Sequence, residues 1–356
     1  MFLLLPLFAF GSNDDTRLEK RINKEFSIQS DGRVELNNKH GNIDIAIGED
    51  HKVKINVLIS ATGGSERKVQ ETLDRITVSF EEGNNRVSAQ TEIESTSGWL
   101  SWFSTGKSSF DIRYQVWVPA DVFLKLSNQY GSIYVETTNR DIDIELAFGN
   151  LHLGDINGRL KLDMSYSEGA ISQIRDGDMV LAFSDLEMED GNDMTMDIKY
   201  SKVESGTFQK LRLVSANSEF QNISVGTVDY DGKYDDVILE HVSQIDVESS
   251  FTGLVIQQLT GESSFEMRYG ELEVQNIHRS FNKLNLNSSF TGVELNFMPD
   301  ASFSVDAETN FCEIEHEGLN VISNIEKTGK RSFQASKGNS DNKVEVRMNY
   351  GELWIH

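Results

Sequence analysis

Apolar and polar residues alternate along most of this chain in short segments, a pattern typical of β-strands with one buried face. In the unit that begins at Tyr234, apolar residues follow at offsets of 3, 5, 8, 11 and 13. Steps of two predict strands, and steps of three predict a bend that skips a residue. The units that begin at Tyr200 and Asn217 keep matching offsets. Each unit is therefore predicted to form two or three short strands, with bends at Asx-Gly pairs such as Asp231-Gly232.

An aromatic residue marks the same place in nearly every unit. A small or polar residue, any residue and an apolar residue follow it, as in Tyr130-Gly131-Ser132-Ile133. The sites recur every 17–21 residues until a final interval of 39, and only the sixth lacks an aromatic side chain. The aromatic or equivalent positions are Tyr130, Phe148, Tyr166, Phe183, Tyr200, Asn217, Tyr234, Phe251, Tyr269, Phe290, Phe311 and Tyr350.

A repeat of this length predicts an all-β fold, a parallel β-helix built as a solenoid of 17–21-residue coils. Two short strands cannot bury their apolar face alone, whereas stacked coils about 4.8 Å apart share one interior. The units are too short for the helix of a leucine-rich repeat or for a propeller blade. The aromatic column is expected to lie inside the solenoid, ring on ring. The clustered methionines are expected to fill interior space; they are Met164, Met179, Met188, Met194 and Met196.

The N-terminal segment predicts an α+β cap that protects the exposed edge of the first coil. Residues 26–62 alternate apolar and polar, and Lys39 to Ile43 echoes the repeat, which suggests that a first coil begins there. Ser65 to Ile76 predicts one short amphipathic helix with Ser65 as its N-cap. Further strands are expected at Ile76–Phe80, Arg86–Glu92 and Phe110–Val118.

Three stretches of the sequence resemble a known bacterial family. The strand Tyr114 to Pro119 ends in Val-Trp-Val-Pro, and Asn128 to Val135 and Arg347 to Ile355 carry the aromatic-Gly turn. These stretches are similar to the "putative adhesin" domain family of unknown function, and the resemblance covers about residues 26–356. It implies an exported β-helix-like protein of a kind common in Bacteroidota, and it supplies no catalytic residues. The chain departs from the family by having Ser, Thr or Asp at many of its Gly positions.

The net charge of the chain excludes some classes of binding partner. Lys and Arg number 33 against 57 Asp and Glu, so the formal charge is −24. A nucleic-acid-binding protein needs a basic surface, so the sequence predicts no nucleic-acid partner, and it also disfavours docking on anionic lipid. The single cysteine, Cys312, cannot form an intramolecular disulfide.

The first residues predict export. Phe2 to Phe10 form a nine-residue apolar run, shorter than the about 20 residues of a membrane span and similar to the hydrophobic region of a signal peptide. A buried N-terminal strand is the alternative interpretation. No later apolar segment predicts an integral membrane span. We therefore expect a signal-peptide remnant at 1–11, a cap with the first strands at 26–120 and repeats at 121–356. The expected location is periplasmic, outer-membrane-associated or extracellular.

No motif in the sequence identifies a catalytic, cofactor or metal site, and none is predicted. Acidic pairs such as Asp176/Asp178 and Asp235/Asp236 are common in so acidic a chain and are interpreted as solvated surface. Asp190 to Asp193 resembles only a fragment of a calcium loop. The sequence favours a non-catalytic, adhesin-like structural or interaction module. The alternative is a carbohydrate-active β-helix enzyme, a lyase or hydrolase. A groove with clustered acids on adjacent coils would favour the enzyme.

One local feature suggests a contact with an unknown protein or glycan. An apolar cluster interrupts the Ser/Gly-rich stretch before the strand at Phe110. Loops are usually polar, so this cluster either folds back on the cap or forms an exposed contact surface. Its residues are Trp99, Leu100, Trp102 and Phe103.

Overall fold

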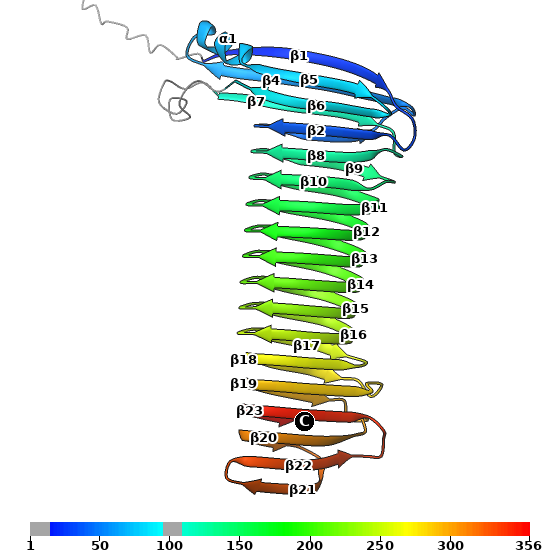
Figure 1. Ribbon diagram of the computed structural model, residues 1–356, viewed down its shortest axis with the longest axis vertical. Coiled ribbons are helices and arrows are strands. Elements are labelled where there is room, and N and C mark those ends of the chain that lie inside the picture. The colour runs from blue at the N-terminus through cyan, green and yellow to red at the C-terminus, as the bar shows by residue number, and fades with distance from the viewer. Residues whose placement is uncertain (1–14, 95–108) are drawn as a thin grey trace, which may run out of the picture.

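The protein is a long rod of stacked β-coils with a helix-bearing cap at one end (Figure 1). The computed structural model describes residues 15–94 and 109–356. Successive coils pair in parallel and in register, so that Leu162 of one coil lies opposite Met179 of the next. The predicted all-β parallel solenoid with one short helix in an N-terminal cap is confirmed.

The coils are built from strands that either cover half of a turn of the solenoid or run almost all the way round it. Their bounds are β2 (Arg33–Lys39), β3 (Ile43–Ile47), β8 (Phe123–Gln129), β9 (Ile133–Thr138), β10 (Ile142–Ala147), β11 (Asn150–Ser165), β12 (Glu168–Ala182), β13 (Asp185–Lys199), β14 (Lys202–Ala216), β15 (Glu219–Lys233), β16 (Asp236–Ser250), β17 (Gly253–Leu259), β18 (Ser263–Ile277) and β19 (Lys283–Phe297).

Each coil is flattened and has two faces. The "following sheet" holds the residues that come after each aromatic position, including β3, β9 and the first half of β11. The "preceding sheet" holds the residues that come before it, including β2, β8, β10 and the second half of β11. The two sheets enclose one apolar interior between them.

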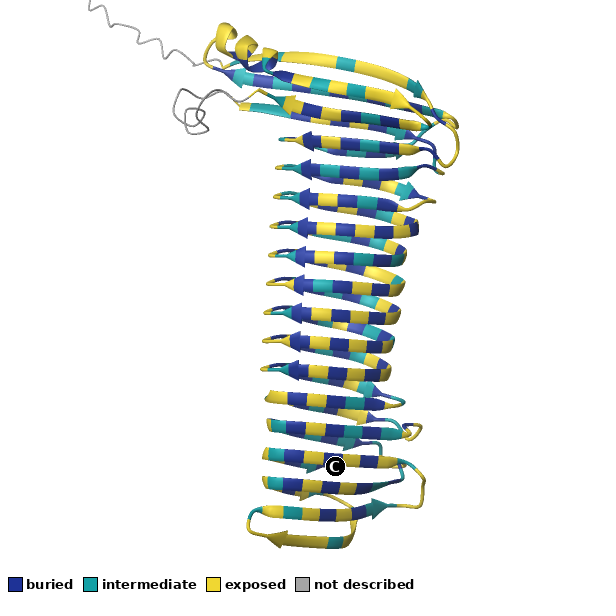
Figure 2. Cartoon of the chain, viewed as in Figure 1, coloured by how far each residue is buried: buried dark blue, intermediate teal, exposed yellow. Residues whose placement is uncertain are grey.

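The interior follows the offsets read from the sequence. In the Tyr234 unit the five apolar residues at offsets 3 to 13 are all buried, and so are the five clustered methionines. Glu248 faces solvent next to the buried Val247, as the two-residue period requires. Figure 2 shows this alternation of buried and exposed residues along every coil. The predictions for these side chains are confirmed.

The aromatic column stacks as expected, but it lies outside the solenoid, so its predicted interior location was wrong. Its rings are between 45% and 61% exposed. Each ring sits at the apex of a tight turn in the left-handed region, with φ between 50° and 61°. An apex points away from the interior, so the side chain leaves the coil. The coil spacing then sets the rings 4.8–5.3 Å apart and within 12° of parallel.

Bends therefore occur at the aromatic positions rather than at the expected Asx-Gly pair. Asp231 and Gly232 both lie within β15, on a straight part of the coil. Gly232 faces inward and touches the ring of Tyr230, so that a Cβ there would collide with the phenol. The glycine makes room for a large interior side chain instead of forming a turn.

Serine fills the inside of the aromatic turns in the middle coils. The amide N–H of Ser184 donates to Ser201 Oγ at 3.0 Å, and the N–H of Ser201 donates to Ser218 Oγ at 3.3 Å. Each of these hydroxyls donates in turn to the carbonyl two residues earlier. This buried ladder holds neighbouring turns in register and explains why Ser replaces Gly after the ring.

Asp235 ends this ladder with a buried carboxyl group. It accepts hydrogen bonds from Ser215 Oγ at 2.6 Å, Ser218 N–H at 2.8 Å and Tyr230 Oη at 2.9 Å. Burial raises the pKa of Asp235, although these donors oppose the rise. The folded chain thus holds this proton more tightly than the unfolded chain. The stability contributed by Asp235 is full below the unfolded pKa of about 3.9 and is lost as the pH rises through the folded pKa.

The N-terminal cap continues both sheets with strands that change direction. On one side β1 and β4 pair antiparallel and lead to β7, and on the other β5 pairs antiparallel with β6. The helix α1 packs on β1 and β4 and buries Val69 and Leu73. The bounds are β1 (Thr16–Ser27), β4 (Lys52–Gly63), α1 (Glu66–Asp74), β5 (Ile76–Gly83), β6 (Arg86–Ile93) and β7 (Ser109–Val118).

The first coil begins in the cap segment, as its echo of the repeat predicted. His40 takes the place of the first ring, with φ of 60°. Its imidazole stacks on Tyr130 at 5.0 Å between ring centroids. The expected helix and the three expected cap strands are all present, and Ser65 occupies the N-cap position.

At the C-terminal end the order of coils differs from the order of the sequence. The last strand, β23 (Lys343–Ile355), lies between β19 and β20 (Phe303–His316) and pairs in parallel with both. The ring of Tyr350 therefore stacks between Phe290 and Phe311. An antiparallel hairpin of β21 (Asn320–Lys327) and β22 (Lys330–Lys337) closes this end.

Candidate functional site

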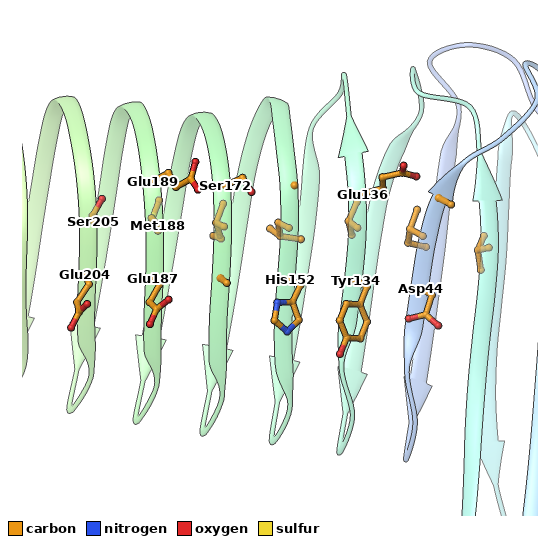
Figure 3. A pocket seen from close by; sticks show the side chains of 18 of the residues that line it. Asp44, Tyr134, Glu136, His152, Ser172, Glu187, Met188, Glu189, Glu204 and Ser205 are labelled. Atoms are coloured by element: carbon orange, nitrogen blue, oxygen red, sulfur yellow. The ribbon is translucent and has the colours of Figure 1, made fainter.

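The following sheet carries a shallow hollow of about 900 Å³ near the cap. It extends across neighbouring coils from β3 and β7 to β15, and its side chains stand in rows along the rod (Figure 3). Ligand sites typically have volumes of about 300–1,000 Å³, so this hollow is large enough for a small ligand or part of a polymer.

The hollow exists because small residues replace larger ones at outward positions on neighbouring coils. Gly154, Ala170 and Ser172 form part of its lining. No larger residue fits at position 154, because a Cβ there would collide with the backbone carbonyl of Glu136. The longer side chains of His152 and Glu187 stand on either side of Ala170 in register.

A stacked aromatic pair forms one wall. Tyr134 and His152 lie on adjacent coils with ring centroids 4.9 Å apart and an interplanar angle of 10°. One face of the His152 ring is thus covered by Tyr134. The other face is directed along the column toward Ala170, whose methyl group is too short to cover it. That ring face is available to a ligand.

Carboxylates form the opposite wall. Glu187 and Glu204 are register partners on adjacent coils, and Glu189 lies on the same strand as Glu187. Glu204 forms an ion pair with Lys202, in which Lys202 Nζ lies 2.7 Å from Glu204 Oε1. At the cap end, burial raises the pKa of Asp44, and Arg113 opposes that rise. The wall offers several acceptors for hydroxyl or ammonium donors.

Most acids of the pairs noted in the sequence have hydrogen-bond or ion-pair partners within the chain. Asp178 makes a two-point ion pair with Arg159, at 2.6 and 2.7 Å, and Asp176 pairs with Arg175 at 3.0 Å. Asp235 is buried in its turn, so its interpretation as solvated surface was wrong, whereas the adjacent Asp236 is exposed as expected. Asp176, Asp178 and Asp235 thus make contacts that hold the local structure.

The hollow was not predicted from the sequence because the residues that line it come from successive coils, 17–18 positions apart along the chain. Aligning the units would have revealed it, since a residue four places after a ring is small at Ala170 but large at Tyr134, His152 and Glu187. The contact suggested at Trp99, Leu100, Trp102 and Phe103 lies outside the described residues.

Two structural features are absent from residues 15–94 and 109–356. Within these ranges, no three or more His, Cys, Asp or Glu side chains are arranged to hold a metal ion. In the same part of the chain, no helix is long and apolar enough to cross a membrane.

Comparison with family models and with characterised proteins gave no match. Solved structures do match over most of their length. A putative adhesin from Parabacteroides distasonis ATCC 8503 is 8% identical, with 79% of this chain and 95% of that chain covered and a TM-score of 0.36. A putative adhesin from Bacteroides fragilis NCTC 9343 is 10% identical, with 95% and 97% covered and a TM-score of 0.28.

A third structure carries a different name. A putative lipid binding protein from Parabacteroides distasonis ATCC 8503 is 10% identical, with 77% of this chain and 93% of that chain covered and a TM-score of 0.31. The adhesin names agree with the family that the sequence motifs resemble. At these TM-scores the likeness carries no argument about function, which rests on the surface of this chain.

Proposed function

We propose that this protein is a non-catalytic, exported interaction module that binds a glycan in the hollow of the following sheet. The observation that carries the proposal is the uncovered face of His152 over Ala170, with carboxylates opposite. The apolar C–H face of a sugar ring packs on an aromatic face and buries apolar surface there. Its hydroxyl groups donate to carboxylates in short, charge-assisted hydrogen bonds.

The solenoid suits this role because it presents the same outward positions at every coil. Sugar units of an extended chain could lie along the rod across the hollow, in contact with rows from several coils. The signal-peptide-like run at Phe2 to Phe10 supports a location where cell-surface glycans occur.

A carbohydrate-active enzyme is the second candidate, and one observation favours it. Glu187 and Glu204 lie opposite each other on adjacent coils. Two carboxyl groups about 5–5.5 Å apart are the arrangement of a retaining glycosidase. Against this, Glu187 is exposed and Glu204 is paired with Lys202, so neither is placed in the apolar surroundings that keep a general acid protonated.

The test is a glycan array probed with the full chain, followed by calorimetry on the best ligand. His152→Ala removes the ring on which the sugar would stack. Ala170→Phe fills the open space between His152 and Glu187. Each is expected to weaken binding about tenfold or more, since buried contacts of this kind dominate affinity. Glu248→Ala, on the preceding sheet, is the matched control and should bind as the wild type does.

Product analysis of the same mixtures separates the two candidates. A module returns the glycan intact. If the wild type cleaved the glycan and Glu187→Gln abolished the cleavage, the protein would be an enzyme instead. Binding that survives both His152→Ala and Ala170→Phe would place the ligand elsewhere and contradict the proposed site.

A further inference from the structure

The exposed ring column is interrupted at one coil, and the interruption forms a second candidate site. Rings stack without a break from His40 to Tyr200 and again from Tyr234 to Phe311. Between these two runs stands Asn217, whose side chain is exposed. We call this place the Asn217 break.

The backbone passes through the Asn217 break unchanged. Asn217 has φ of 54°, within the range of the ring positions. Its N–H donates to the carbonyl of Lys233 at 2.9 Å, and Tyr200 and Tyr234 make the equivalent bonds at 3.0 Å. Only the side chain differs, and the short amide occupies the base of the space that a ring fills in every neighbouring coil.

The two tyrosines that border the Asn217 break therefore face each other across one missing ring. Two strand spacings separate their backbones by roughly 9.6 Å, which is the thickness of one stacked ring plus a contact on each side. Everywhere else in the column a ring fills such a space, with centroids 4.8–5.3 Å from those of its neighbours. A planar ring from a ligand would gain two stacking contacts at once.

Two lysines lie immediately beside this break, and Asp197 and Asp231, the register partners of Val214, lie two residues further from it. Lys199 and Lys233 are the register partners of Ala216, the residue just before Asn217. Both are exposed; Lys199 pairs with Asp197 at 3.2 Å, and Lys233 forms no ion pair within the described residues. In the unbroken run from Tyr130 to Phe183, the residues just before the rings carry no charge.

We propose that the Asn217 break binds a planar aromatic ring that bears a carboxylate. The ring stacks between Tyr200 and Tyr234, and the carboxylate pairs with Lys233. The amide of Asn217 offers one donor group and one acceptor at the ring edge. This site is distinct from the proposed glycan hollow and does not depend on it.

The test is a ligand-observed NMR titration of the full chain with benzoate. Cyclohexanecarboxylate, which has the same charge and no flat ring, is the matched ligand and should bind at least about tenfold more weakly if stacking drives recognition. Benzamide, which keeps the ring without the charge, should bind about threefold to tenfold more weakly.

Protein variants locate the binding. Asn217→Phe completes the column and should abolish binding while leaving the circular dichroism unchanged, because Phe occupies the same turn position in other coils. Lys233→Ala should weaken the binding of benzoate but not that of benzamide, whereas Lys161→Ala, on a distant coil, should change neither. Equal binding of benzoate by the wild type and Asn217→Phe would overturn the proposal. So would equal binding of benzoate and cyclohexanecarboxylate by the wild type, a result that does not depend on any variant folding.

Discussion

Two phenylalanines on neighbouring coils provide a direct test of which side of the solenoid carries the stability. Phe265 is 1% exposed and lies in the interior between Val247 and Leu286, its register partners. Phe251 is 47% exposed and stacks between Tyr234 and Tyr269 on the outside. The same change to Ala at each position therefore compares a core ring with a column ring.

Phe265→Ala should lower the free energy of unfolding more than Phe251→Ala does. Phe265→Ala removes a fully buried ring and leaves a cavity, which costs about 3–5 kcal/mol of unfolding free energy. Phe251→Ala removes two ring contacts of about 0.5–1.5 kcal/mol each, and its ring edges were already in water. We expect the lower half of that total, about 1–2 kcal/mol.

Urea unfolding followed by circular dichroism would measure both losses from the shift in midpoint at constant slope. Glu248→Ala, a solvent-facing change on β16 just before Phe251, should cost less than about 0.5 kcal/mol and serves as the control. If Phe251→Ala shifted the midpoint as far as Phe265→Ala, the exposed column would be as important as the core, and the assignment of inside and outside would be wrong.

Two further predictions concern the buried carboxyl group and the inserted strand. Burial raises the pKa of Asp235, so the wild type should lose stability relative to Asp235→Asn as the pH rises from 4 to 8; urea midpoints that run parallel across this range would contradict that effect. A chain truncated before Lys343 loses the strand that pairs with both β19 and β20, so residues 303–337 should become sensitive to protease while earlier coils stay resistant. Protection of the hairpin in the truncated chain would show that β20 can dock on β19 without β23.

The fold and its inward residues could be predicted from the sequence because both depend on local periodicity. A step of two places every second side chain on one face of a strand, so Val237, Leu239 and Val247 had to share an interior. A 17–21-residue repeat is long enough only for one coil of paired strands. The short helix and the first coil at His40 followed from equally local patterns.

The side to which each ring points was decided by tertiary structure. The spacing of the column is the same whether the rings lie inside or outside, and only the left-handed turn at each ring directs its side chain outward. The position of β23 between β19 and β20 could not be predicted from the order of the strands in the sequence either. Strand pairing depends on which strand edges are still unpaired when the last strand is added. The hollow beside His152 and the break at Asn217 exist only because stacking brings residues 17–18 positions apart into contact. The sequence thus determined which residues are buried together, because burial follows period, and the stacking of coils determined which exposed residues become neighbours.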